Sequence, residues 1–219
     1  MTDILRSIIL YAVPVILAIT LHEAAHGYVA RRLGDNTAWV LGRVTLNPLK
    51  HIDPVGTILV PAILLAAGAL AGFGGVMFGW AKPVPVNFSR LRNPKIDMIW
   101  VALAGPASNL VQALLWAAAA KLVVLAAPSA LFGPLIEICY GGIIVNLVLM
   151  AFNLLPALPL DGGRIVAGLL PWRLSMKYAE TERYGLIILA VIIFSGLFEY
   201  VAQPVLDLAR WLFFAAAGS

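Results

Sequence analysis

Apolar stretches separated by short polar loops make up most of the chain. The stretches that approach the roughly 20 apolar residues of a membrane-spanning helix are Ile4–Leu33, Pro54–Trp80, Ile96–Leu125, Leu135–Leu155 and Tyr184–Phe198. This pattern predicts an all-α polytopic membrane protein with about four to six transmembrane or re-entrant segments. Because no repeat or low-complexity tract divides the chain, we expect residues 1–219 to form a single transmembrane domain.

Shorter stretches predict further elements between and after the spans. Trp39–Leu46 is rich in β-branched and aromatic residues, which favours a short strand or hairpin in a loop. Lys82–Val86 contains two prolines, each of which favours extended chain before it, so we expect a second short β element in this loop. Val205–Phe214 is amphipathic and too short to span a bilayer, so we expect it to lie in the membrane interface.

The composition agrees with a membrane protein. The 219 residues are 62% hydrophobic and 12% charged, whereas soluble domains are about 45–50% apolar and about 25% charged. We therefore expect contact with the lipid bilayer and residence in the cytoplasmic membrane. The net charge of +4 is spread over loops and forms no basic face, which excludes nucleic acid as an expected partner.

A metal-binding pattern lies inside the first apolar stretch. His22-Glu23-Ala24-Ala25-His26 has the spacing H-E-x-x-H, and residues four apart lie above one another on the same helix face. Both imidazoles can therefore bind one zinc ion, and Glu23 would lie beside it as a general base. Ionisable groups in an apolar segment are costly and usually functional. The alternative is a pair of interfacial histidines with Glu23 facing solvent.

A catalytic zinc usually has three protein ligands and one open position, so a third ligand is needed. Asp161 is the best candidate, because it follows a helix that Pro156 and Pro159 should end. The glycines after it allow close approach of the backbone. The alternative for Asp161 is a turn or helix-capping aspartate at the interface.

Three stretches together resemble the signatures of the site-2 proteases, which are intramembrane zinc metalloproteases. They are His22–His26, Gly105–Asn109 and Asn153–Gly163, in the family's order. The resemblance implies that His22, His26 and Asp161 bind one Zn²⁺ and that Glu23 is the catalytic acid and base. Many members carry PDZ or CBS domains, for which this chain has no room, so its mode of substrate selection is left open.

Two amides, Asn109 and Asn153, lie within apolar spans. Buried amides need hydrogen-bonding partners, and bonds between helices would satisfy them. The functional alternative is that they orient the site or bind the substrate backbone.

The basic residues predict which side of the membrane holds the site. Of fifteen lysines and arginines, twelve fall within residues 31–50, 82–95 and 164–183. The positive-inside rule places these loops in the cytoplasm, so the site should lie nearer that face. For Asp161 to meet the histidines, Pro54–Trp80 must then enter and leave on the same side. A glycine-rich re-entrant segment satisfies this condition, and a plain transmembrane helix is the competing interpretation.

These observations predict an enzyme that hydrolyses peptide bonds of membrane-embedded protein substrates with metal-activated water. An intramembrane metal transporter is one alternative, since buried histidines and acids also mark ion pathways. A catalytically inactive membrane scaffold is another, although no ligand or base is missing from the motifs.

Overall fold

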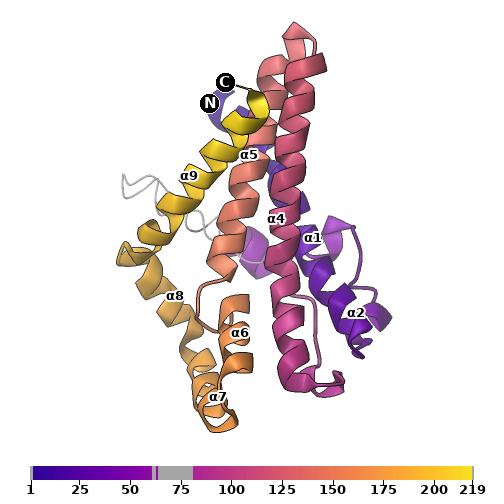
Figure 1. The fold of residues 1–219 in the computed structure, drawn as a ribbon, viewed down its shortest axis with the longest axis vertical. Helices are drawn as coiled ribbons and strands as arrows, with labels where there is room; N and C mark the ends of the chain where they lie inside the picture. Colours follow the sequence, from indigo (N-terminus) through magenta and orange to yellow (C-terminus); the bar gives the residue numbers. More distant parts are fainter. Residues whose placement is uncertain (1, 61–62, 64–80, 219) are drawn as a thin grey trace.

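The computed structural model describes residues 2–60, 63 and 81–218, and helices are the only regular secondary structure in those residues (Figure 1). Three helices are long and apolar enough to cross a membrane: α1 (Thr2–Arg32), α4 (Pro94–Ala126) and α5 (Ser129–Asn153). The multi-pass, all-helical prediction is therefore confirmed. A bent helix pair near the C-terminus would raise the number of candidate spans to four.

The three long helices form the bundle that carries the site. α1 and α5 run in the same direction and α4 runs against them (Figure 1). Small side chains on α4, such as Ala113 and Ala117, pack against Ile143 and Leu147 of α5. Small residues let apolar helices approach closely where lipid provides no hydrophobic driving force.

The connection between α4 and α5 is shorter than predicted. α4 ends at Ala126 because Ala127 precedes Pro128 and is extended, at φ −74° and ψ 136°. α5 then begins at Ser129 rather than at the predicted Leu135.

The C-terminal part differs from the sequence prediction. It contains α6 (Asp161–Leu169), α7 (Trp172–Ala179), a 3-10 turn (Glu180–Tyr184), α8 (Gly185–Phe194) and α9 (Leu197–Ala217). The predicted span Tyr184–Phe198 is broken between α8 and α9, where the chain bends by 68°. Gly196 has φ 77°, a left-handed conformation that ends helices. The predicted interfacial tail Val205–Phe214 is the middle of α9, which packs on α4 and α5.

The prediction of a strand or hairpin at Trp39–Leu46 is wrong. Trp39 lies in α2 (Thr37–Val40), a single helical turn, and residues 41–46 follow as turns and bends. Asp35 accepts hydrogen bonds from the backbone N–H (2.9 Å) and the hydroxyl (2.5 Å) of Thr37. The Trp39 ring lies 3.4 Å from the Arg31 guanidinium carbon. These local contacts outweigh the β-propensity of the segment.

Residues 81–87, which we call the strap, have neither helix nor strand structure. The predicted β element at Lys82–Val86 is therefore absent, although the segment is free of helix as expected. Pro83 and Pro85 lack the N–H that pairing in a sheet requires.

The predicted re-entrant segment Pro54–Trp80 lies mostly outside the described residues. Its first part is a π-helical turn (Pro54–Leu59), capped by Asp53 through the N–H groups of Val55 and Gly56. The residues that flank the segment meet, because the N–H of Lys82 donates to the carbonyl of His51 at 2.9 Å.

Candidate metal centre

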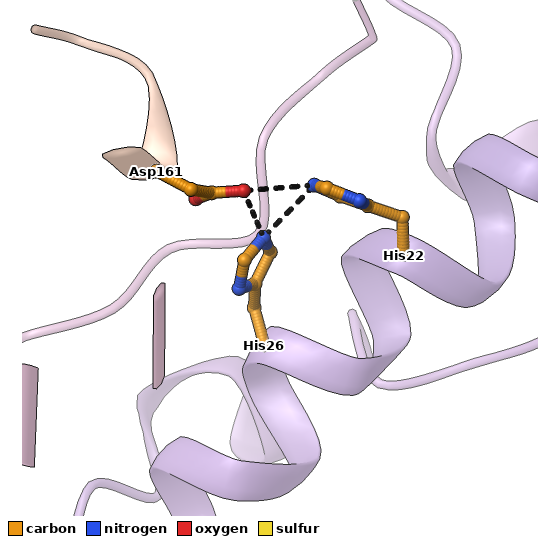
Figure 2. A group of neighbouring side chains, drawn as sticks. All are labelled: His22, His26 and Asp161. Carbon is orange, nitrogen blue, oxygen red and sulfur yellow. Dashed lines mark hydrogen bonds and ion pairs between the residues drawn. The ribbon is translucent and has the colours of Figure 1, made fainter. Parts of the chain in front are cut away.

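The structure brings together the three side chains that the sequence suggested as ligands. His22 and His26 project from one face of α1 toward Asp161, the first residue of α6 (Figure 2). The Nε2 atoms of the histidines are 3.0 Å apart. Asp161 Oδ2 lies 3.2 Å from His22 Nε2 and 3.4 Å from His26 Nε2. All three residues are largely buried.

Two glycines place Asp161. α5 ends at Asn153, and residues 154–160 turn back to start α6. A Cβ on Gly162 would collide with the carbonyl oxygen of Leu154, and a Cβ on Gly163 would lie 2.6 Å from the carbonyl carbon of Ala157. The close backbone approach that was predicted for these glycines is therefore an approach to residues 154–158 of the turn. It holds the start of α6 against the end of α5.

The hydrogen bonds of the two histidines fix their tautomers. His26 Nδ1 lies 2.7 Å from the carbonyl oxygen of Val101, which can only accept, so Nδ1 carries the proton. His22 Nδ1 lies 2.6 Å from Asn109 Oδ1 and donates in the same way. In the neutral imidazoles each Nε2 therefore presents a lone pair toward Asp161.

The donor set fits zinc. Asp161 Oδ2 is buried without a hydrogen-bond partner, so lone pairs of two nitrogens and one oxygen converge on one point. Such an arrangement is repulsive unless a proton or a metal cation lies between the atoms. Tetrahedral zinc with bonds of about 2.0–2.1 Å holds its ligand atoms about 3.3 Å apart, and the three separations here are 3.0 to 3.4 Å. Imidazole and carboxylate are ordinary zinc ligands.

Gly105 of α4 lets the two histidines approach that helix. A Cβ there would lie 2.5 Å from His22 Cε1 and from His26 Nε2. The Gly105–Asn109 motif therefore begins with glycine because no larger residue fits beside the two histidines. Asn109, one turn later on α4, supplies the oxygen for His22.

Glu23 lies beside the cluster, between the two candidate ligands His22 and His26 along α1. Its Oε2 accepts a hydrogen bond of 2.7 Å from the backbone N–H of Val84 in the strap. Glu23 and the three candidate ligands line one cleft of about 780 Å³. The cleft walls are mostly apolar and include Ile19 of α1, Phe152 of α5 and Leu189 of α8. The Glu23 carboxylate and the three candidate metal ligands therefore share a largely apolar cavity.

Asn153 lines the cleft but does not contact the ligand atoms described above. Its amide donates to the carbonyl of Leu149 at 3.0 Å, within its own helix. Its role toward the substrate stays a prediction.

Sequence reasoning missed Asn146, which is buried and bonds to Asn109. The signal that could have found it is the one that singled out Asn109, an amide in an apolar span.

Comparison with known proteins assigns a family. Residues 120–196 match the model of peptidase family M50. The chain is 41% identical over 204 residues to "Putative zinc metalloprotease YwhC" of Bacillus subtilis (strain 168), which covers 90% of this chain and 86% of the relative. It is 28% identical over 202 residues to "Putative zinc metalloprotease Rip2" of Mycolicibacterium smegmatis, covering 90% of this chain and 68% of the relative.

No solved structure matches the chain. The relative from Bacillus subtilis is at least 30% identical to this chain and is matched over more than two thirds of its own length. This chain therefore belongs to peptidase family M50, the site-2 protease family, and is a zinc metalloprotease.

Proposed function

We propose that the protein hydrolyses peptide bonds of membrane-embedded protein substrates, with His22, His26 and Asp161 holding one zinc ion. The observation that carries the proposal is the convergence of three lone pairs beside Glu23 in an apolar cleft. When bound, zinc supplies Lewis-acid chemistry, which lowers the pKa of a water and polarises the scissile carbonyl.

Glu23 is the general base and acid in this proposal. Its carboxylate takes a proton from the attacking water and later gives that proton to the leaving amine. The Val84 N–H occupies Oε2 and leaves Oε1 available for the proton. His22 and His26 keep their Nε2 lone pairs for the metal because Asn109 and Val101 hold the Nδ1 protons.

The cleft favours an apolar peptide segment as substrate. Its walls of leucine, isoleucine and phenylalanine match the side chains of transmembrane helices. A substrate helix hides its carbonyls in its own hydrogen bonds, so the segment must unwind before Glu23 and water can act on it. An unwound, extended substrate segment could form few backbone hydrogen bonds with the strap, because the N–H groups of Val84 and Asn87 already donate to Glu23 and Asp35.

The site lies nearer the cytoplasmic face in this proposal. The positive-inside rule places the basic loops after α1 and before α4 in the cytoplasm. α1 ends and α4 begins toward the same end of the bundle, at the lower part of Figure 1. Water would therefore reach the centre from the cytoplasm.

The experiment that tests the function replaces Glu23 by glutamine. Glu23→Gln keeps the size of the side chain but cannot take a proton, so it should bind zinc and lose cleavage. Membrane proteomes of cells with the wild type and with Glu23→Gln are compared, and uncut substrates should accumulate in the variant. Purified His22→Ala should lose zinc, which shows that the metal is held at this site.

A metal transporter would give a different result. Transport does not require a proton acceptor beside the ligands, so Glu23→Gln would leave it intact. Unchanged membrane proteomes together with retained metal transport would overturn the proposed function, as would full peptidase activity of Glu23→Gln. Stoichiometric zinc in His22→Ala would remove its structural basis.

A further inference from the structure

A row of buried amides crosses the bundle behind the metal centre. Asn109 and Gln112 come from α4, and Asn146 comes from α5. Asn109 and Asn146 are completely buried, at 0% exposure. An amide with four hydrogen-bonding sites is costly at such a position unless its neighbours satisfy it.

The direction of these hydrogen bonds follows from a backbone carbonyl. The carbonyl of Gly142 can only accept, and Asn146 Nδ2 donates to it at 2.9 Å. Asn146 Oδ1 therefore faces Asn109 and accepts from Asn109 Nδ2 at 2.9 Å. Since the nitrogen of Asn109 is engaged there, its oxygen faces His22 Nδ1, at 2.6 Å. One chain of bonds thus runs from the backbone of α5 to a candidate zinc ligand.

We propose that Asn146 is a positioning residue that fixes the tautomer of His22 through Asn109. The inference rests on the proposed function in taking His22 as a zinc ligand. Asn109 Nδ2 has a second acceptor, the carbonyl of Ala18, but at 3.3 Å this bond is longer than most N–H···O bonds. Asn146 is therefore the stronger constraint on the Asn109 amide.

Loss of that constraint has a definite chemical consequence. If the Asn109 amide turns over, it presents its NH₂ group to His22 Nδ1, which must then accept. The proton of His22 moves to Nε2, and a protonated Nε2 has no lone pair for the metal. Partners that hold the remote nitrogen of a ligating histidine are worth 10–100-fold in metal affinity. Asn146 acts one bond further away, so about tenfold is expected.

The structural alternative is that Asn146 only joins α5 to α4. Gln112 provides a matched control for that alternative, because it is also buried, on α4, and also lies against the carbonyl of Ala18, at 3.5 Å. Gln112 has no bond to Asn109 or to a candidate ligand among the contacts of the described residues.

The experiment measures the zinc dissociation constant of full-length detergent-solubilised variants by competition with a chelator. Asn146→Leu, which removes the acceptor but keeps the number and branching of the side-chain heavy atoms, should weaken zinc binding about tenfold. Gln112→Leu should stay within about twofold of the wild type, because Gln112 has no bond to Asn109. The visible spectrum of the Co²⁺-loaded Asn146→Leu protein should change, while that of Gln112→Leu should not.

Equal zinc affinities for Asn146→Leu and Gln112→Leu, with wild-type Co²⁺ spectra in both, would overturn the inference. If Asn146→Leu does not fold, Asn146→Ser is compared in its place. Serine can bond to the carbonyl one turn earlier but is too short to reach Asn109, so the same loss of affinity is expected. His22→Ala distinguishes failure of this inference from failure of the proposed function. If His22 is not a zinc ligand, the His22→Ala protein keeps its zinc.

Discussion

Glu23 Oε2 accepts a 2.7 Å hydrogen bond from the backbone N–H of Val84, a residue 61 positions further along the chain. The strap that carries Val84 is held at both ends. Lys82 N donates to the His51 carbonyl at 2.9 Å, and Asn87 N donates to Asp35 Oδ2 at 2.7 Å. The position of the proposed general base therefore depends on a loop that is anchored by residues between α1 and the start of the Pro54–Trp80 segment.

Removal of the Val84 N–H should lower the rate of cleavage. Val84→Pro deletes this donor in a segment that already contains Pro83 and Pro85, so the backbone change is small. The Glu23 carboxylate loses its orientation, and misplacement of a catalytic group by about 1 Å can cost about 100-fold in rate. We expect a fall in kcat of roughly 10- to 100-fold with unchanged zinc content.

Val84→Ala is the control, because it removes the buried side chain but keeps the N–H. It should retain most of the activity. If Val84→Ala and Val84→Pro lose activity equally, packing of the valine side chain matters and the bond to Glu23 does not.

Substitution of Gly105 should destroy the metal site. Gly105→Ala places a methyl group 2.5 Å from His22 Cε1 and His26 Nε2, well inside van der Waals contact. Overpacking of this kind typically costs about 1–3 kcal/mol, and here relief requires displacement of the two proposed zinc ligands. The purified variant should bind zinc at least about tenfold more weakly and should be inactive.

Gly133→Ala makes the same change at a helical glycine with nothing within 4 Å of the added methyl. Zinc binding should be that of the wild type, and stability should be equal or slightly higher, since alanine favours helix. Normal zinc affinity in Gly105→Ala would show that the histidines can yield without loss of the site.

The sequence predicted the long helices well because their apolar length is an intrinsic property. The predicted Ile4–Leu33 and Ile96–Leu125 agree closely with α1 and α4. The H-E-x-x-H pair was also readable, since helix geometry alone places residues four apart together. Asp161 could be proposed as the third member because the prolines and glycines after Asn153 predict that the helix ends there.

Other features depend on tertiary contacts that a linear pattern does not carry. The segment Trp39–Leu46 has strand-type residues, but the Asp35 carboxylate and the Arg31–Trp39 contact stabilise a helical turn there. The continuation of the C-terminal helix through Val205–Phe214 follows from packing on α4 and α5. The hydrogen bond from Val84 to Glu23 uses a backbone N–H, which every residue except proline has. The identity of residue 84 therefore gives no sign of this bond.

Asp35 should make the protein sensitive to acid. Burial raises the pKa of its carboxyl, but hydrogen bonds from Thr37 and Asn87 and the charge of Arg90 outweigh burial and lower it. The folded protein therefore binds this proton less readily than the unfolded chain. The stabilisation is present above the ordinary pKa of about 3.9 and is lost as the pH falls below it.

Melting temperatures of the detergent-solubilised protein at pH 7 and pH 3 test this prediction. Asp35→Asn should lower Tm at pH 7, because the strap and Thr37 lose charge-assisted hydrogen bonds worth about 1.5–3 kcal/mol each. It should also shrink the difference in Tm between the two pH values. Asp207→Asn is the control, since Asp207 forms an exposed pair with Arg210, which contributes little. An undiminished acid effect in Asp35→Asn would assign it to other carboxyls.

The membrane topology around the strap gives the last prediction. His51 and Lys82 are hydrogen-bonded, and α1 ends where α4 begins, so the segment between them should enter and leave on the cytoplasmic side. In a Cys139→Ala background, single cysteines at the exposed positions Leu49 and Ser89 should be protected from an impermeant thiol reagent in intact cells and should react in inside-out vesicles. A cysteine at the exposed Ser129, which begins α5, should give the opposite pattern. If the cysteine at Ser89 reacts in intact cells while that at Leu49 does not, the segment crosses the membrane, and the basic loops on either side of it cannot share the cytoplasmic face.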